Sequence, residues 1–187
     1  MATATRLTLD EFLALPETEP PSEFIRGEVE QKAMPSAYHA LVVSQLSHLF
    51  LVFLGRTRLA LVMSDPRHAD RAEDRSYLPD VSVVLSSRAP SNLSLARGPL
   101  ELVPDIAIEV LSPDDRPGRV SEKVAFYLRA GTPIVWLIDP IDRTLTEHRP
   151  VSEARLYGDR EQVSAAPILP GFNLDLEELF SVLATDS

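Results

Sequence analysis

Residues 104–113 of the chain read PDIAIEVLSP, a run of apolar and β-branched residues between two prolines. Such a run between two breakers predicts a β-strand. The side chains of a strand alternate between its two faces, which puts Ile106 and Ile108 on one face. Ala107 and Glu109 share the other face. Because apolar residues occur on both faces, we expect this strand to be buried on both sides, near the middle of a sheet.

Glu109 is the unusual residue of this strand. A buried carboxylate without a partner costs several kcal/mol or takes up a proton, so Glu109 needs a positive charge beside it. Two kinds of partner meet this need. One is a basic side chain in a structural ion pair, such as Arg116 or Arg119, and the other is a metal ion.

Length and composition limit the classes of protein that the chain can belong to. The 187 residues suit one domain, 1–187, and 44% hydrophobic with 25% charged residues is a typical globular composition. The absence of cysteine excludes disulfides, thiolate catalysis and cysteine zinc sites. No apolar signal segment is visible at the N-terminus, and the longest apolar stretch, Ala40–Leu54, is interrupted by polar residues and too short to cross a bilayer. We therefore expect a cytoplasmic protein with no membrane partner.

The charged residues carry two further indications. The formal net charge of −10 counts against strong non-specific binding to nucleic acid. The basic residues are 16 arginines and only two lysines, Lys32 and Lys123. A lysine against this background is a candidate for a task that arginine performs poorly, because its ammonium is compact and can give up a proton.

The rest of the chain alternates between helical and strand patterns. The spacing predicts helices over Thr8–Leu15, Ala37–Leu54 and Arg119–Ala130, and one more after Gly171. It predicts a bent hairpin over Phe24–Glu30 and strands over Leu59–Met63, Tyr77–Leu85, Ile134–Asp139 and Leu145–His148. The segment Asp65–Ser76 is expected to be a loop or hairpin tip, and Ser86–Gly98 a polar loop. The strands before and after the third helix should be parallel, because a helical crossover joins them. The predicted class is mixed α/β (α+β), with a central mixed sheet flanked by helices.

Three residues of this arrangement are candidates for chemistry. At helical spacing, Lys123 lies on the inward face of its helix, between Val120 and Val124. A short crossover can fold that helix back over the end of the preceding strand, which brings Lys123 toward Glu109. Asp80, at the start of an apolar strand, is the third member of the predicted site.

Two carboxylates and a lysine at one end of a sheet suit metal-assisted hydrolysis of a phosphodiester. Magnesium prefers hard oxygen ligands and keeps several waters. It lowers the pKa of a bound water and neutralises developing charge, while an ammonium group stabilises the phosphate oxygens or orients the water. Asp80 and Glu109 are thus the predicted ligands of Mg²⁺ or Mn²⁺, and Lys123 is the predicted catalytic lysine.

These residues resemble a known family. The segments that carry the likeness are Pro79-Asp80, IEVLSP at 108–113, SEKVAFY at 121–127, Arg26-Gly27-Glu28, His39, WLIDP at 136–140 and LPGF at 169–172. Together they are similar to the PD-(D/E)XK nuclease superfamily, and in particular to the bacterial branch labelled "putative restriction endonucleases". The resemblance implies a restriction-endonuclease-like fold, divalent-metal nuclease chemistry and DNA as substrate. It also implies a homodimer, since cutting both strands usually takes two active sites.

The resemblance adds two residues to the site and contains one departure. Glu28 becomes an additional site carboxylate, and His39 a substrate-binding or supporting residue. Read without the resemblance, Glu28 is an exposed hairpin charge and His39 a packed or capping histidine. Leu111 stands where the superfamily signature has its lysine, so the resemblance requires Lys123 to supply that group from the helix.

Two functions of different classes follow. The first is a Mg²⁺- or Mn²⁺-dependent DNA endonuclease. The second is a catalytically inactive domain of the same fold that binds a partner protein or a second copy of itself. The acidic balance and the Leu111 departure motivate the second hypothesis, in which Glu109 pairs with Lys123 or an arginine.

Overall fold

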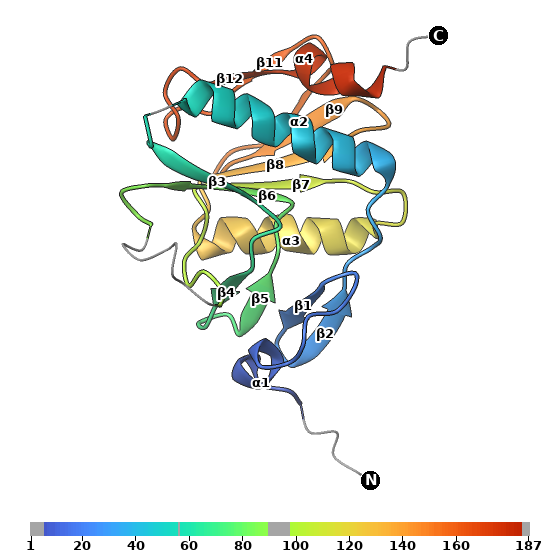
Figure 1. The fold of residues 1–187 in the computed structure, drawn as a ribbon, viewed down its shortest axis with the longest axis vertical. Helices are drawn as coiled ribbons and strands as arrows, with labels where there is room; N and C mark the ends of the chain where they lie inside the picture. Colours follow the sequence, from blue (N-terminus) through green and yellow to red (C-terminus); the bar gives the residue numbers. More distant parts are fainter. Residues whose placement is uncertain (1–5, 56, 90–97, 185–187) are drawn as a thin grey trace.

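The computed structural model describes residues 6–55, 57–89 and 98–184. A central mixed sheet lies between two helical layers, with helix α2 above it and helix α3 below it in Figure 1. This is the mixed α+β architecture that the sequence predicts. The central sheet has the strand order β10-β9-β8-β7-β6-β3. Its strands are β3 (Ala60–Ser64), β6 (Val81–Leu85), β7 (Ile106–Val110), β8 (Ile134–Asp139), β9 (Thr144–His148) and β10 (Arg155–Tyr157).

Strand β7 occupies the interior of this sheet, with β6 antiparallel on one side and β8 parallel on the other. All five of its residues are buried, which confirms the prediction of a central strand covered on both faces. The connection from β7 to β8 runs through α3 (Pro117–Ala130), so the predicted helical crossover between parallel strands is also confirmed. Gly131 ends this helix in the left-handed conformation, with φ 100°, which glycine adopts without strain.

The two faces of β7 pack against different helices. Ala107 joins a core cluster with Tyr127 of α3, whereas Ile106 and Ile108 belong to the larger cluster under α2 (Ala37–Leu54). Ser36 caps α2, because its side chain accepts a hydrogen bond from the N–H of His39. Side chains of Ala107 and Glu109 therefore face α3, and this geometry places the functional site on that side.

Helix α2 is the longest helix among the described residues, and it packs beside α4 (Leu176–Phe180) and a short 3₁₀ turn, Ser181–Leu183 (Figure 1). Its bounds, Ala37–Leu54, are those that the sequence predicts. Within the described part of the chain, it is the one helix that reaches the length and hydropathy of a membrane span, a property it shares with core helices of globular proteins. Its residues Val42, Leu46 and Phe50 are buried against the central sheet.

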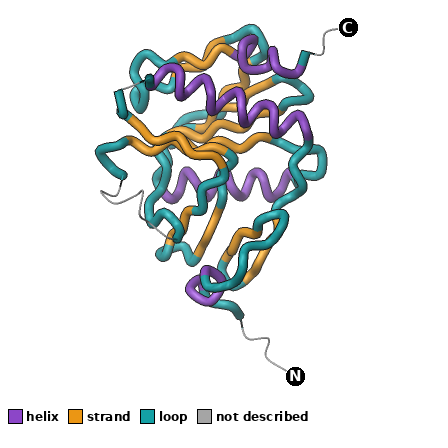
Figure 2. The backbone as a smooth tube through the Cα atoms, in the orientation of Figure 1, coloured by secondary structure: helices purple, strands orange, loops and turns teal. Residues whose placement is uncertain are grey.

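A second, smaller sheet lies near the N-terminal end, at the bottom of Figure 2. Its order is β2-β1-β5-β4, formed by β1 (Ser22–Ile25), β2 (Glu28–Gln31), β4 (His68–Asp70) and β5 (Arg75–Tyr77). The hairpin of β1 and β2 is the one predicted around Gly27. The prediction of a loop or hairpin tip over Asp65–Ser76 missed two paired strands, β4 and β5.

The prediction of one strand over Tyr77–Leu85 is wrong. β5 ends at Tyr77 in the small sheet, and β6 begins at Val81 in the central sheet. Pro79 lies between them and has no N–H to donate to a ladder, which explains the break. Asp80 consequently lies at the junction of the two sheets rather than within a continuous strand.

The ends of the chain follow the capping signals. Thr8 forms a capping box with Glu11 at the start of α1 (Leu9–Leu13), and Asp175 caps α4. A short hairpin, β11 (Gln162–Ser164) with β12 (Asn173–Asp175), was not predicted, because three-residue strands are too short to show a period. The predicted polar loop Ser86–Gly98 lies mostly outside the described residues, since 90–97 are not among them.

His68 on β4 is buried between the two sheets. Its Nδ1 lies 2.8 Å from the carbonyl oxygen of Leu102, its Nε2 lies 3.2 Å from the hydroxyl of Ser82, and its ring stacks on Tyr77. Burial lowers the pKa of His68 from 6.5 to about 4, because the charged imidazolium loses its hydration.

We expect this histidine to make stability depend on pH. Between about pH 6.5 and 4, His68 is protonated in the unfolded chain but stays neutral in the folded chain. The free energy of unfolding therefore falls as the pH drops through this range, by about 3 kcal/mol at most. Urea unfolding at several pH values should show that the free energy of unfolding of His68→Gln falls less with decreasing pH than that of the wild-type protein. The exposed His48→Gln variant should keep the wild-type slope; equal slopes in all three proteins would contradict the assignment.

Candidate functional site

Asp80 and Glu109 are brought together by strand register. In the antiparallel pair of β6 and β7, Val81 lies opposite Ile108. Extended by one residue, the same register puts Asp80 opposite Glu109, and such pairs share a face with Cβ atoms about 4.5–5.5 Å apart. A hydrogen bond of 2.7 Å from the N–H of Val110 to Oδ2 of Asp80 fixes this arrangement. The two predicted carboxylates therefore lie side by side at one end of the central sheet.

Asp80 is buried and has three hydrogen-bonding partners. Its Oδ1 accepts from Nζ of Lys32 at 2.6 Å, and its Oδ2 lies 3.1 Å from Nε2 of His39, in addition to the N–H of Val110. Burial alone would raise the pKa of Asp80, but Lys32 and His39 outweigh it and hold the pKa well below its usual range. Asp80 is therefore ionised at neutral pH, and its carboxylate in turn raises the pKa of His39.

Glu109 has a different set of partners on the α3 side. Its Oε2 accepts from Nζ of Lys123 at 2.8 Å, and its Oε1 accepts from the hydroxyl of Tyr127 at 2.5 Å. Burial raises the pKa of Glu109 to about 7, although Lys123 acts in the opposite direction. The predicted approach of Lys123 from the crossover helix is thus what the structure shows, and the buried Tyr127 of the same helix also contacts Glu109.

Glu23 is a third buried carboxylate that sequence reasoning missed. Its Oε1 lies 3.0 Å from Nζ of Lys123 and accepts a hydrogen bond of 2.9 Å from the N–H of Leu78. Burial would raise the pKa of Glu23, but Lys123 and Lys32 together lower it. A glutamate on a short hairpin strand carries no sequence signal of this kind, because its partners are distant in the chain.

Lys32 is also absent from the sequence-based site, although one signal pointed to it. It is one of only two lysines, and both lysines meet at this site. We call this set of side chains the charged cluster: Glu23, Lys32, His39, Asp80, Glu109 and Lys123. Where Glu109 is ionised and His39 is neutral, three carboxylates and two ammonium groups leave one negative charge, and the charged cluster then favours a further cation.

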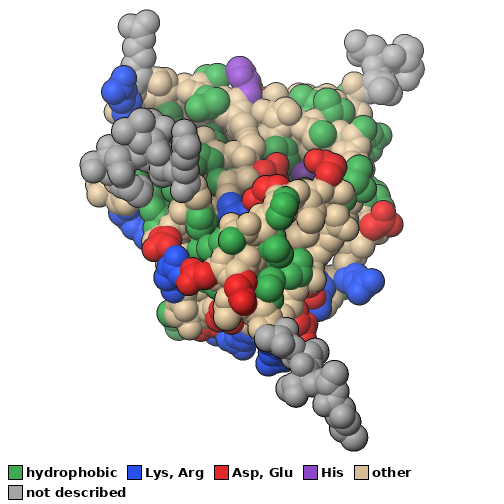
Figure 3. Space-filling model, turned by 60° about the horizontal axis from the view of Figure 1, so that its bottom comes forward, with side chains coloured by type: hydrophobic (Ala, Val, Ile, Leu, Met, Phe, Trp, Pro, Cys, Tyr) green, Lys and Arg blue, Asp and Glu red, His purple; other side chains and the backbone are tan. Residues whose placement is uncertain are grey.

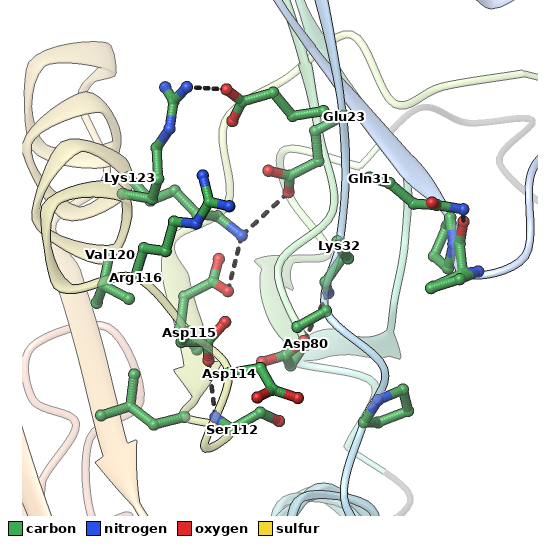
Figure 4. Close-up of a pocket in the computed structure, with 18 of the residues that line it drawn as sticks. Glu23, Gln31, Lys32, Asp80, Ser112, Asp114, Asp115, Arg116, Val120 and Lys123 are labelled. Atoms are coloured by element: carbon green, nitrogen blue, oxygen red, sulfur yellow. Dashed lines mark hydrogen bonds and ion pairs between the residues drawn. The ribbon is translucent and has the colours of Figure 1, made fainter.

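The charged cluster lines a cleft of about 710 Å³. The walls come from the N-terminal half of α3, the loop after β7, and the hairpin of β1 and β2 with the segment that follows it. In Figure 4, Lys123 extends from α3 toward Glu23, while Lys32 and Asp80 point toward each other from the opposite wall.

The cleft is acidic as a whole. Among the described residues that line it, the carboxylate side chains are Glu19, Glu23, Glu30, Asp65, Asp80, Glu109, Asp114, Asp115 and Glu122, and the basic ones are Lys32, Arg116, Arg119 and Lys123. Acidic side chains also gather at the centre of the face shown in Figure 3. A polyanion entering this cleft would therefore meet repulsion unless cations accompany it.

The donor chemistry of the cleft fits a hard divalent ion. Asp80 and Glu109 offer carboxylate oxygens, the ligands that Mg²⁺ and Mn²⁺ prefer, and the residual negative charge favours a cation. The four oxygens of the pair are, however, all engaged by protein donors. Within residues 6–55, 57–89 and 98–184, no three His, Cys, Asp or Glu side chains are arranged to hold a metal together. An ion would therefore compete with the partners already present.

The structure also separates the two remaining sequence candidates. His39 lies in the charged cluster, in contact with Asp80, while its backbone N–H completes the cap of α2. Glu28 is exposed at the start of β2, opposite Ile25, and it is not among the residues that line the cleft. The structure does not bring Glu28 to Asp80 and Glu109, because its strand directs it to solvent; Glu23 on the paired strand takes that position. Leu111 lines the cleft without a polar group, and Lys123 supplies the ammonium.

Lys123 should matter more for stability than an exposed basic residue on the same helix. Its side chain is 14% exposed and faces two buried carboxylates, so Lys123→Met at pH 8 should cost about 3–5 kcal/mol. Arg119→Met breaks a pair with Glu30 whose arginine is 49% exposed, and should cost less than about 1 kcal/mol. Urea unfolding measures the free energy of unfolding of each variant. Similar decreases for Lys123→Met and Arg119→Met would contradict the buried pairing of Lys123.

Comparisons with known proteins identify the family. The family described as "Uma2: Putative restriction endonuclease" matches residues 9–177. The crystal structure of a "putative nuclease belonging to DUF820" from Anabaena variabilis is similar, with a TM-score of 0.85 and 34% identity over 95% of this chain and 99% of that one. No match was found among proteins of curated function. On the extent of these matches, and with the charged cluster at the end of its central sheet, the chain belongs to the Uma2 family of restriction-endonuclease-like proteins.

Proposed function

We propose that the protein is a divalent-metal-dependent endonuclease that hydrolyses DNA phosphodiester bonds. Asp80 and Glu109 would hold a Mg²⁺ or Mn²⁺ ion, and Lys123 would act at the scissile phosphate. The observation that carries the proposal is the pair of buried carboxylates on adjacent strands, next to a lysine and open to a cleft. Membership of a restriction endonuclease family supports it.

Each residue of the charged cluster has a role in this chemistry. When bound, the metal ion supplies Lewis acidity, which lowers the pKa of a water and neutralises charge on the phosphate. Nζ of Lys123, at the cleft wall, can donate to a phosphate oxygen or orient the attacking water. The hydroxyl of Tyr127 fixes the rotamer of Glu109, and His39 with the N–H of Val110 fixes that of Asp80.

The charge of the cleft bears on how DNA would bind. Arg116, the N-cap residue of α3, and Arg119, in its first turn, are the arginines that line the cleft and the best candidates for phosphate contacts. The surrounding carboxylates oppose strong non-specific binding. We therefore propose that DNA binds weakly without metal ions and that specificity depends on the divalent cation.

One observation favours a second function. Since protein donors already engage every oxygen of Asp80 and Glu109, the charged cluster is complete as a structural element without metal. The chain would then be an inactive domain that acts by binding a protein or a second copy of itself. Helix α2 offers a surface for a homodimer, because it has no charged residue and exposes Leu51 (57%) and Val52 (64%).

Cleavage assays test the first function. Purified protein with Mn²⁺ should cut plasmid or single-stranded DNA, and chelation should stop it. Asp80→Asn and Glu109→Gln should each lower the rate by at least about 100-fold, because they remove metal ligands while keeping the shape of the side chains. Asp114→Asn is the matched control, since Asp114 lines the same cleft outside the charged cluster.

Thermal melting separates the two functions. Millimolar Mn²⁺ should raise the Tm of the wild-type protein by mass action on the folded state, and this rise should be absent in Asp80→Asn. Wild-type protein that neither cuts DNA nor gains stability from Mn²⁺ would instead favour the non-enzymatic domain.

A further inference from the structure

Lys32 sits in an environment that is typical of a bound cation. Its Nζ lies 2.6 Å from Oδ1 of Asp80, 3.1 Å from the carbonyl oxygen of Leu78 and 3.3 Å from Oδ1 of Asp65. Three oxygen atoms thus surround one compact positive charge, on a side chain that is only 17% exposed. Arginine could not take this position as well, because its planar guanidinium is larger and directs its donors in a fixed fork.

The position of this ammonium coincides with the oxygen that a metal would need. Oδ2 of Asp80 is held by the N–H of Val110 and by His39. The other oxygen, Oδ1, is hydrogen bonded to Lys32 and to no other group among the described residues. A metal ion bound by Asp80 through Oδ1 would share this oxygen with the Lys32 ammonium, 2.6 Å away, and the repulsion between the two cations favours loss of the ammonium.

Charge balance in the charged cluster favours such an exchange. In the state with all three carboxylates ionised and His39 neutral, Glu23, Asp80 and Glu109 oppose the ammonium groups of Lys32 and Lys123, which leaves −1. Adding a divalent ion while both lysines remain gives +1 in a buried site. Adding it while Lys32 leaves gives 0, the state with the smallest charge to bury.

The chain around Lys32 allows the side chain to leave without unfolding. Lys32 follows the last residue of β2, and its own N–H donates to the carbonyl oxygen of Pro21 at 2.9 Å, so its backbone is anchored. Its four-carbon stem is flexible, and the head group lines the open cleft. Rotation of one side chain is therefore sufficient for the exchange.

We propose that Lys32 is the internal counter-ion of the metal site. Its ammonium neutralises Asp80 in the metal-free protein and is displaced into the cleft when a divalent ion binds. This inference rests on the proposed function, because it needs Asp80 to bind a metal. It adds that metal binding competes with a residue of the protein itself.

Lysine side-chain NMR tests the exchange on the wild-type protein, without any cleavage assay. Because the chain has only two lysines, ¹⁵N-lysine labelling gives two ammonium signals, which Lys32→Met assigns. In the metal-free protein both should be protected by their buried ion pairs. Saturating Mg²⁺ should remove or strongly shift the Lys32 signal, because the released ammonium exchanges with water, and should leave the Lys123 signal protected.

Titration calorimetry with Mn²⁺ provides the second measurement. Lys32→Met and Lys32→Gln should bind Mn²⁺ with a Kd at least about tenfold lower than wild type, because the competing ammonium is gone. Lys123→Met is the matched control: it removes the same charge from the charged cluster but leaves Oδ1 of Asp80 occupied, so its gain should be smaller. Lys32→Gln retains a donor for Asp80 and covers the case in which Lys32→Met does not fold.

The outcomes separate this inference from the proposed function. If wild type binds Mg²⁺ with the Lys32 signal still protected, or if both Lys32 variants bind Mn²⁺ no tighter than wild type, the counter-ion role is wrong while the metal site remains. If wild type and both variants bind no ion, the metal site and the counter-ion role fail together. Binding by a Lys32 variant but not by wild type supports the displacement.

Discussion

The structure depends on neutralising three carboxylates that are buried where two sheets meet. Glu23 comes from β1, Asp80 from the link between β5 and β6, and Glu109 from β7. Left unpaired, each would cost several kcal/mol, so the two lysines are structural requirements as well as candidate functional groups. Lys123 joins α3 to β7 and β1, and Lys32 joins the N-terminal hairpin to the central sheet. These ion pairs therefore fix the position of the small sheet against the large one.

The same constraint shapes the chemistry that the site can perform. A cluster of three carboxylates that lines a cleft is suited to a hard cation when all three are ionised. Because every oxygen of Asp80 and Glu109 already has a protein partner, an entering cation competes with those partners. The ion pair that stabilises Asp80 thus competes with metal binding at the same carboxylate. The acidic walls of the cleft also repel the phosphates of a substrate, unless cations enter with them.

Much of the fold followed from local patterns. The strand in the apolar run at 104–113 and the helical crossover after it are both confirmed. The errors have identifiable causes. The predicted strand Tyr77–Leu85 is interrupted at Pro79, and its two parts belong to different sheets. The charged segment Asp65–Ser76, predicted as a loop or hairpin tip, contains paired strands that its pattern did not indicate. Charged residues on a short strand at the edge of a sheet do not produce an alternating apolar pattern, so periodicity could not detect them.

For the site, the sequence by itself determined three members. It placed Glu109 in a buried strand, Asp80 next to a strand start and Lys123 on the inward face of the crossover helix, because each position follows from periodicity and one short connection. Only the tertiary structure decided that Glu23 and Lys32 complete the charged cluster and that Glu28 does not. Those contacts join segments about 50 or more positions apart in the chain, 48 between Lys32 and Asp80 and 55 between Glu23 and Leu78. No local sequence pattern shows which face of a short hairpin will pack against a sheet formed by distant segments. The packing of the small sheet against the central sheet decides this, and only the folded structure shows it.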